Sequence, residues 1–92
     1  MPEQTAEVVV YRTQGCPFCI AAAKFLDDRD VTYREVHLDD HANRRAVTSE
    51  ILPGHDTVPL VVIGGKPVGG FMELRALDAR GGLDPLLAGN AS

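Results

Sequence analysis

The sequence has no long hydrophobic run, no excess of basic residues and only two cysteines. No stretch approaches the roughly 18 apolar residues of a membrane span, so a membrane partner is not expected. The net charge of −4 argues against nucleic-acid binding, which usually needs a basic surface. Residues 1–5 carry neither a basic segment nor an apolar core, so no secretory signal is expected. These absences favour a cytoplasmic protein.

The composition that remains is that of an ordinary globular chain. Hydrophobic residues make up 45% and charged residues 24% of the 92 positions. We find no internal repeat and no linker composition. A chain of this length is expected to form a single domain, residues 1–92, with a core from about residue 7 to residue 88.

The two cysteines lie close together, at a predicted strand-to-helix junction. Cys16 and Cys19 are separated by two residues, one of them Pro17. The hydrophobic run 8–11 precedes them and a helical pattern at 20–26 follows. Unpaired N–H groups and the helix dipole favour an anion at a helix N terminus, so the Cys16 thiol is expected to be partly ionised. We therefore predict Cys16 as a nucleophile and Cys19 as its resolving partner.

Two other interpretations of the cysteine pair are less favoured. The thiols could be buried structural residues, although Pro17 and the helix start argue against it. They could be half of a zinc site, which would need two more ligands. The chain supplies His37, His41 and His55, none of which stands in a matching motif.

The run from His37 to His41 could also be interpreted as a metal cluster. We favour a structural role instead: His37 ends a strand, Asp39 or Asp40 caps a helix, and His41 is exposed. No metal site is therefore expected.

Hydrophobic periodicity predicts an α/β fold in the order β-α-β-α-β-β-α. The expected strands are 7–11, 31–38, 59–63 and 67–68, and the expected helices are 17–29, 41–51 and 71–80. A last helical turn is expected from residue 85 to 87 or 88, capped by Asp84. Cys19, Ala22, Ala23 and Leu26 form a core-facing helical stripe, which predicts Cys19 as buried and Cys16 as exposed.

Four short segments give the chain a family resemblance. They are Val10-Tyr11, Cys16-Pro17-Phe18-Cys19, Thr57-Val58-Pro59 and Gly69-Gly70. Their order and separations resemble those of the glutaredoxins, and residues 76–87 resemble the bacterial glutaredoxin 3 type. The resemblance covers about residues 7–88. It implies a thioredoxin-like fold, a four-stranded mixed sheet of order 2-1-3-4 and a cis peptide bond before Pro59.

The resemblance also implies a function and a set of binding residues. The protein would be a thiol–disulfide oxidoreductase that reduces protein disulfides and protein–glutathione mixed disulfides. Glutathione would be its co-substrate, and no cofactor would be tightly bound. The Val58 backbone would pair with the glutathione cysteinyl unit, and the N–H groups of Phe71 and Met72 would bind the γ-glutamyl carboxylate. The residues implied to contact glutathione are Arg12, Thr13, Phe18, Thr57, Val58, Pro59, Gly70, Phe71 and Met72.

The chain departs from the family pattern at three of these positions. Thr13 stands where many relatives have a lysine, and Arg12 comes one residue earlier. Met72 stands where an acidic residue often contacts the glutathione amino group. Phe18 replaces the common tyrosine and loses its hydroxyl.

The partners expected from the resemblance are proteins that carry disulfides or glutathione, with ribonucleotide reductase as one family-level candidate. The protein is expected to be a monomer. One alternative is a glutaredoxin-like reductant recharged by thioredoxin reductase, which the changes at Thr13 and Met72 motivate. Another is a glutathione-ligated iron–sulfur carrier, which Pro17 disfavours. Arg44 and Arg45 could reach the glycine carboxylate of glutathione, but a solvated helix face is the favoured interpretation.

Overall fold

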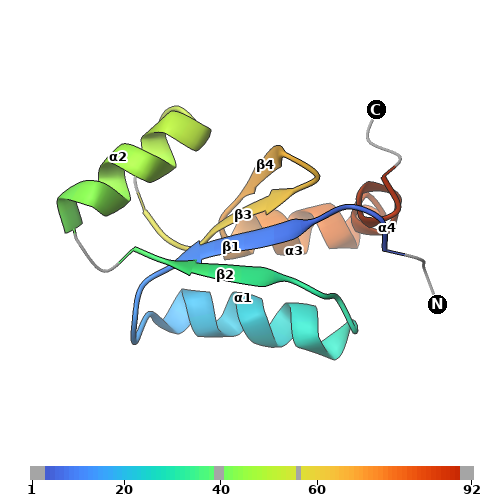
Figure 1. Ribbon diagram of the computed structural model, residues 1–92. Coiled ribbons are helices and arrows are strands. Elements are labelled where there is room, and N and C mark those ends of the chain that lie inside the picture. Colours follow the sequence, from blue (N-terminus) through green and yellow to red (C-terminus); the bar gives the residue numbers. More distant parts are fainter. Residues whose placement is uncertain (1–3, 39–40, 56, 90–92) are drawn as a thin grey trace.

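The structure, a computed structural model that describes residues 4–38, 41–55 and 57–89, contains one four-stranded mixed sheet. Its strands are β1 (Val8–Arg12), β2 (Arg34–His37), β3 (Leu60–Ile63) and β4 (Lys66–Gly69), in the order β2-β1-β3-β4 (Figure 1). β1 runs parallel to β2, whereas β3 is antiparallel to both of its neighbours. The predicted order 2-1-3-4 is confirmed.

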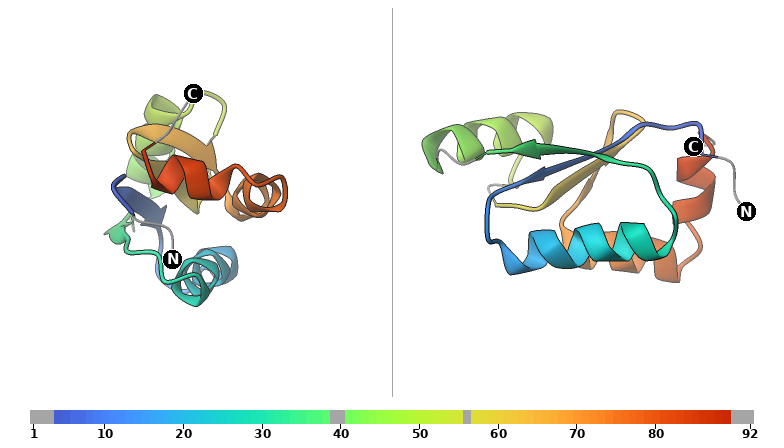
Figure 2. Two further views of the ribbon diagram at one scale, coloured as in Figure 1. Left: turned by 90° about the vertical axis from the view of Figure 1, so that its right-hand side faces the viewer. Right: turned by 60° about the horizontal axis from the view of Figure 1, so that its bottom comes forward.

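The helices lie on both sides of this sheet. They are α1 (Pro17–Asp28), α2 (His41–Ile51), α3 (Phe71–Ala79) and α4 (Leu83–Leu87). α1 and α3 lie on one side and α2 on the other (Figures 1 and 2). Within the part of the chain that the structure describes, no helix is long and apolar enough to span a membrane.

The main core lies between the sheet and the helices α1, α3 and α4. Val8 and Val10 of β1 pack there against Leu26 of α1 and Leu74 of α3. Val9 points to the other side of the sheet, where it lies opposite Val62, and both are buried. Because side chains alternate along a strand, three consecutive buried valines require cover on both faces.

The second strand is shorter than predicted. It was expected over residues 31–38, but the ladder with β1 covers only Arg34–His37. The backbone N–H of Val31 donates to the carbonyl of Leu26 at 3.0 Å, and that of Thr32 donates to the Gln4 side chain at 2.8 Å. Residues 31 and 32 therefore bond to the end of α1 and to Gln4 rather than to β1.

The last helix begins earlier than predicted. Asp84 was expected to cap a turn starting at Pro85, but α4 spans Leu83–Leu87 with Gly82 as its N-cap. Leu83 is buried in the core, and we attribute the earlier start of α4 to this packing. Pro85 is tolerated because N–H groups in a first helical turn have no partner within the helix.

The other element bounds differ by one or two residues or agree. Arg12, predicted in a turn, ends β1, and Lys66 and Gly69, predicted outside the fourth strand, belong to β4. α1 and α3 each end one residue before the prediction, and α2 has the predicted bounds. The caps predicted at Asp39 or Asp40 lie outside the described residues. That the chain forms a single domain stays a prediction.

Candidate active site

The cysteine pair lies where β1 gives way to α1. β1 ends at Arg12, and Gly15 completes the turn with a φ of +70°, a conformation that favours glycine. Cys16 is the N-cap of α1 and Pro17 occupies the first helical turn, as predicted. The Cys16 Sγ accepts a hydrogen bond from the backbone N–H of Cys19 at 3.2 Å. The Cys16 sulfur therefore takes up one of the N–H groups that have no partner within the first turn of α1.

The two sulfurs have different surroundings. Cys16 is half-exposed, whereas Cys19 is fully buried against the core. Burial is the main cause that raises the pKa of Cys19, and its hydrogen bond with Cys16 adds to it, to about 12. Cys19 therefore keeps its proton at neutral pH while Cys16 faces the solvent. The arrangement allows attack by Cys16 and later resolution by Cys19.

A cis peptide bond joins Val58 and Pro59 just before β3, as the resemblance implied. Pro59 is buried, Val58 is half-buried and Thr57 is exposed. The His55 ring anchors this segment, since its Nε2 lies 3.3 Å from the Pro59 carbonyl oxygen. The segment thus presents a fixed stretch of backbone before β3.

The start of α3 forms a further part of the site. The Gly70 N–H donates to the Glu73 carboxylate at 2.7 Å, which closes the N-terminal end of the helix. Gly70 is buried, Phe71 is half-buried and Met72 is 61% exposed. The first turn of α3 therefore offers backbone N–H groups, an aromatic ring and an exposed thioether.

Contacts between these segments bring distant parts of the sequence together. The rings of Phe18 and Phe71 lie 6.5 Å apart, which joins the cysteine turn to the start of α3. A Cβ placed on Gly70 would lie 3.5 Å from the Pro59 carbonyl and 3.8 Å from the His55 ring. The start of α3 therefore touches both the cysteine turn and the cis-proline segment.

The remaining predicted residues are Arg12 and Thr13, with Arg44 and Arg45 as a less favoured possibility. Arg12 pairs with Glu35 on β2 at 2.8 Å, and Thr13 is half-buried next to it. Arg44 and Arg45 belong to α2, on the other side of the sheet from α1 (Figure 1). A contact of Arg12 or Thr13 with glutathione stays a prediction. For Arg44 and Arg45 a solvated helix face was favoured; Arg45 is exposed, whereas Arg44 is half-buried.

Sequence reasoning missed three residues of the site: Glu35, Glu73 and the structural role of His55. Glu73 had a readable signal, because a glutamate at the third helical position commonly bonds the N-cap N–H. Glu35 had none, since its pairing with Arg12 depends on the register between β1 and β2. In the described segments, no group of three or more His, Cys, Asp or Glu residues is placed to hold a metal ion.

The comparison with known proteins decides the family. The model of the glutaredoxin family matches residues 8–68. The chain belongs to the glutaredoxins. It is 40% identical over 84 residues to Glutaredoxin 3 of Escherichia coli (strain K12), which covers 89% of this chain and 98% of that protein.

Solved glutaredoxin structures share the fold. A buckwheat glutaredoxin–glutathione complex aligns with a TM-score of 0.78 and 29% identity over 97% of this chain and 84% of that one. A glutaredoxin from Brucella melitensis aligns with a TM-score of 0.77 and 33% identity over 100% of both chains. The fold is therefore the thioredoxin-like fold of glutaredoxins, and the chain is a thiol–disulfide oxidoreductase of that family.

Proposed function

We propose that this glutaredoxin reduces protein–glutathione mixed disulfides and protein disulfides with electrons from glutathione. The observation that carries the proposal is the contrast between a half-exposed Cys16 capping α1 and a buried, protonated Cys19. A nucleophilic cysteine must be accessible to the substrate and its thiolate must be stabilised. A resolving cysteine must instead stay protonated until the mixed disulfide has formed. The solved complex of a relative with glutathione supports the choice of co-substrate.

With a mixed disulfide, the Cys16 thiolate attacks the glutathione sulfur. A bond forms between the two sulfurs, the protein thiolate leaves, and it takes a proton from water. A second glutathione thiolate then attacks the sulfur of the bound glutathione. Oxidised glutathione leaves, and the Cys16 thiolate is restored.

With a protein disulfide, Cys16 first forms a mixed disulfide with the target protein. This bond removes the free Cys16 sulfur, whose hydrogen bond helps to keep the proton on Cys19. Cys19 then ionises more easily and attacks the Cys16 sulfur, which releases the target thiolate. Two glutathione molecules reduce the resulting disulfide between Cys16 and Cys19.

Glutathione binding is assigned to the segments that meet around Cys16. The Val58 backbone would pair with the cysteinyl unit, flanked by Thr57, Pro59 and the Phe18 ring. The N–H groups of Phe71 and Met72 would take the γ-glutamyl carboxylate, as helix N termini commonly do. Gly70 would let the ligand approach closely, and Arg12 and Thr13 would lie toward the glycine carboxylate.

The partners would be proteins that carry accessible disulfides or bound glutathione, with ribonucleotide reductase as one candidate. The protein would act as a monomer in the cytoplasm, with glutathione as its co-substrate and without a tightly bound cofactor. A lone Cys-x-x-Cys pair in a chain without other cysteines supports the reducing compartment.

The test is a glutathione-coupled assay with a glutathionylated protein substrate and with a protein disulfide. Cys16→Ser is expected to abolish both activities, because the attacking sulfur is lost. Cys19→Ser is expected to retain much of the deglutathionylation and to lose disulfide reduction. Full activity of Cys16→Ser, or turnover with thioredoxin reductase but not with glutathione, would overturn the proposal.

A further inference from the structure

We propose that Glu35 is a positioning residue of the thiol site: by pairing with Arg12, it fixes a guanidinium beside the cysteine pair and balances its charge. The inference rests on the proposed role of Cys16 as the nucleophile. It concerns a residue on β2, which no sequence motif of the cysteine turn contains.

Two hydrogen bonds hold the guanidinium of Arg12, one at each of two nitrogens. Its NH1 lies 2.8 Å from the Glu35 Oε2, and its Nε donates to the Thr13 carbonyl at 3.4 Å. The side chains of Arg12 and Glu35 are 13% and 32% exposed, so the pair is partly shielded from solvent. A guanidinium bonded at two nitrogens has a fixed orientation. Glu35 supplies the stronger of the two bonds.

The strand register brings this pair to the side of the sheet that carries α1. In the parallel ladder, Glu35 lies opposite Val10 and Arg12 lies opposite His37. Val10 packs in the core with Leu26 of α1, so its neighbours on the same face also point toward that helix. Arg12 and Glu35 therefore lie on the face of the sheet that α1 covers, at the end of β1 that leads into the cysteine turn.

The charge of Arg12 reaches both sulfurs. The hydrogen bond with Glu35 is the largest cause that raises the pKa of Arg12, and both cysteines act in the same direction. Burial dominates the raised pKa of Cys19, and the charge of Arg12 opposes it. The guanidinium is thus within electrostatic range of the thiol pair, and the opposite charge of Glu35, 2.8 Å from it, would partly cancel the positive potential there.

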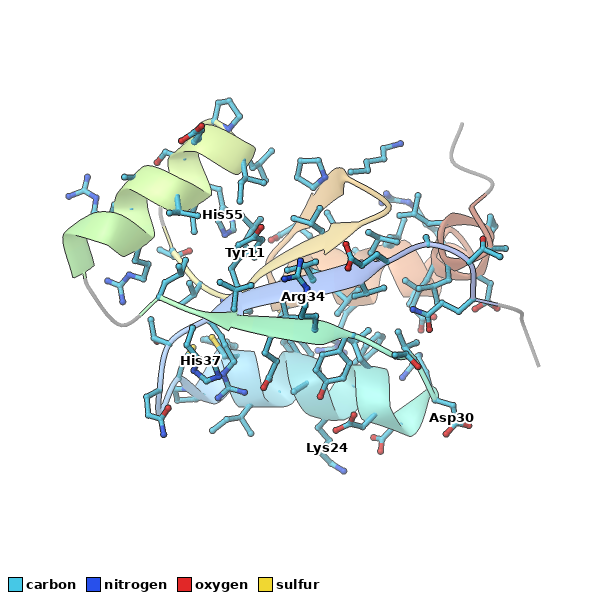
Figure 3. The ribbon with its side chains drawn as sticks, in the orientation of Figure 1. Tyr11, Lys24, Asp30, Arg34, His37 and His55 are labelled. Atoms are coloured by element: carbon cyan, nitrogen blue, oxygen red, sulfur yellow. The ribbon has the colours of Figure 1, made fainter. Side chains whose placement is uncertain are left out.

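Other titratable groups face Glu35 and enter any pH dependence. The Nε2 of His37 on β2 lies 3.9 Å from the Glu35 Oε1, and Tyr33, just before β2, interacts with Glu35 and Arg12. Figure 3 shows His37 on the α1 side of β2, at the end next to the start of α1. At the start of α1, both cysteines interact electrostatically with Arg12. Further along α1, Asp27 forms a hydrogen bond with Tyr33. Because His37 lies next to the Glu35 carboxylate, its contribution has to be separated from that of Glu35.

The test measures the rate of Cys16 alkylation by iodoacetamide as a function of pH, with mass spectrometry to assign the modified cysteine. Glu35→Gln keeps an oxygen that Arg12 can bond but removes the negative charge. The midpoint of the Cys16 profile is expected to move to lower pH by about half a unit, the size expected for one partly screened charge nearby. Arg12→Gln is expected to move it to higher pH by a similar amount, and the double variant is expected to lie near wild type.

The matched control is Asp78→Asn. Asp78 pairs with Arg29 at 2.7 Å, and its carboxylate is about as exposed as that of Glu35 (30% against 32%), although Arg29 is more exposed than Arg12. Its loss is expected to leave the alkylation profile unchanged. The Glu35→Gln comparison is repeated in a His37→Gln background, where the shift is expected to persist. Should Glu35→Gln fail to fold, Arg12→Gln carries the same test with the opposite sign.

Unchanged profiles for Glu35→Gln and Arg12→Gln would overturn the inference, as would a shift that disappears in the His37→Gln background. Equal shifts for Glu35→Gln and Asp78→Asn would show a general effect of surface charge and would also overturn it. The assay needs no glutathione. Failure of glutathione turnover in the wild-type protein would therefore contradict the proposed function without deciding the role of Glu35.

Discussion

At the scale of single residues, the main contrast is between two thiols on one helix. Cys16 caps α1 and receives an N–H, whereas Cys19 lies one turn later with its side chain in the core. Cys16 is the N-cap and lies outside the helix proper, whereas Cys19 lies on the helix face that points into the core. The roles proposed for the two cysteines rest on this difference in exposure.

The buried Cys19 thiol makes the stability of the reduced protein change with pH in the alkaline range. Burial raises the pKa of Cys19 from an ordinary 9.0 to about 12, so between these values the unfolded chain loses a proton that the folded chain keeps. The free energy of unfolding is therefore expected to fall as pH rises from 9 toward 12, by at most about 1.4 kcal/mol per unit for this group. Urea unfolding at several pH values, with a phosphine reductant, measures the slope.

Cys19→Ser is the control for this effect, because a hydroxyl does not ionise in this range. Its slope is expected to be shallower than that of wild type. Some dependence remains above pH 10, since burial also raises the pKa of Tyr33. Equal slopes in the two proteins would contradict the assignment of the effect to Cys19.

At the scale of elements, the site is built from the beginnings of two helices and the loop before β3. α1 supplies the sulfur, α3 supplies N–H groups, and the cis bond at Val58–Pro59 sets the backbone between them. The first turn of α3 already carries one acidic residue, Glu73, but its carboxylate bonds the Gly70 N–H. A carboxylate for the amino group of a bound glutathione is therefore expected to be absent at Met72, which is 61% exposed.

Met72→Asp tests this interpretation of the first turn of α3. A carboxylate beside the ammonium group of glutathione is expected to lower KM for glutathione by about 1.5- to fivefold, the range of an exposed ion pair. The glutathione-coupled assay measures it, with salt titration to show the electrostatic origin. Met72→Asn is the control, because it matches the shape without the charge. An equal fall of KM in both variants would contradict an ion pair.

At the scale of the whole molecule, one core holds the site segments in place. Val8 and Val10 of β1, Leu26 of α1 and Leu74 of α3 share it, and α4 closes it with Leu83 and Leu86. α1 and α3 both begin toward the same end of the sheet (Figure 1). Their common orientation brings Phe18 and Phe71 into contact although 53 positions separate them in the chain.

Leu26→Ala tests how much this core contributes to stability. Leu26 is fully buried, and such truncations cost about 2–5 kcal/mol. A small domain has roughly 5–15 kcal/mol in total, so a large part of the stability is expected to be lost. Urea unfolding measures it, and Ile20→Ala on the same helix is the control. Ile20 is 53% exposed, so its truncation is expected to cost less than about 1 kcal/mol. Similar losses in both variants would contradict this account of the core.

Local patterns in the sequence determined much of this protein. The apolar run at β1, the stripe through Cys19 and Leu26, and the glycines at turns depend on near neighbours in the chain, so periodicity predicts them. The family resemblance added the sheet order and the cis bond, which no local pattern contains. The placement of Cys16 and Cys19 at a helix start needed only Pro17 and the flanking runs.

Only the tertiary structure decided what depends on register and packing between distant segments. The end of α1 bonds Val31 and so shortens β2, and burial of Leu83 starts α4 before Asp84. The pairing of Arg12 with Glu35 joins residues 23 positions apart. Such contacts follow from how strands align and how a core fills, and these are cooperative properties of the whole chain. The pairing of Glu35 with Arg12 could therefore be found only once β1 and β2 were in register.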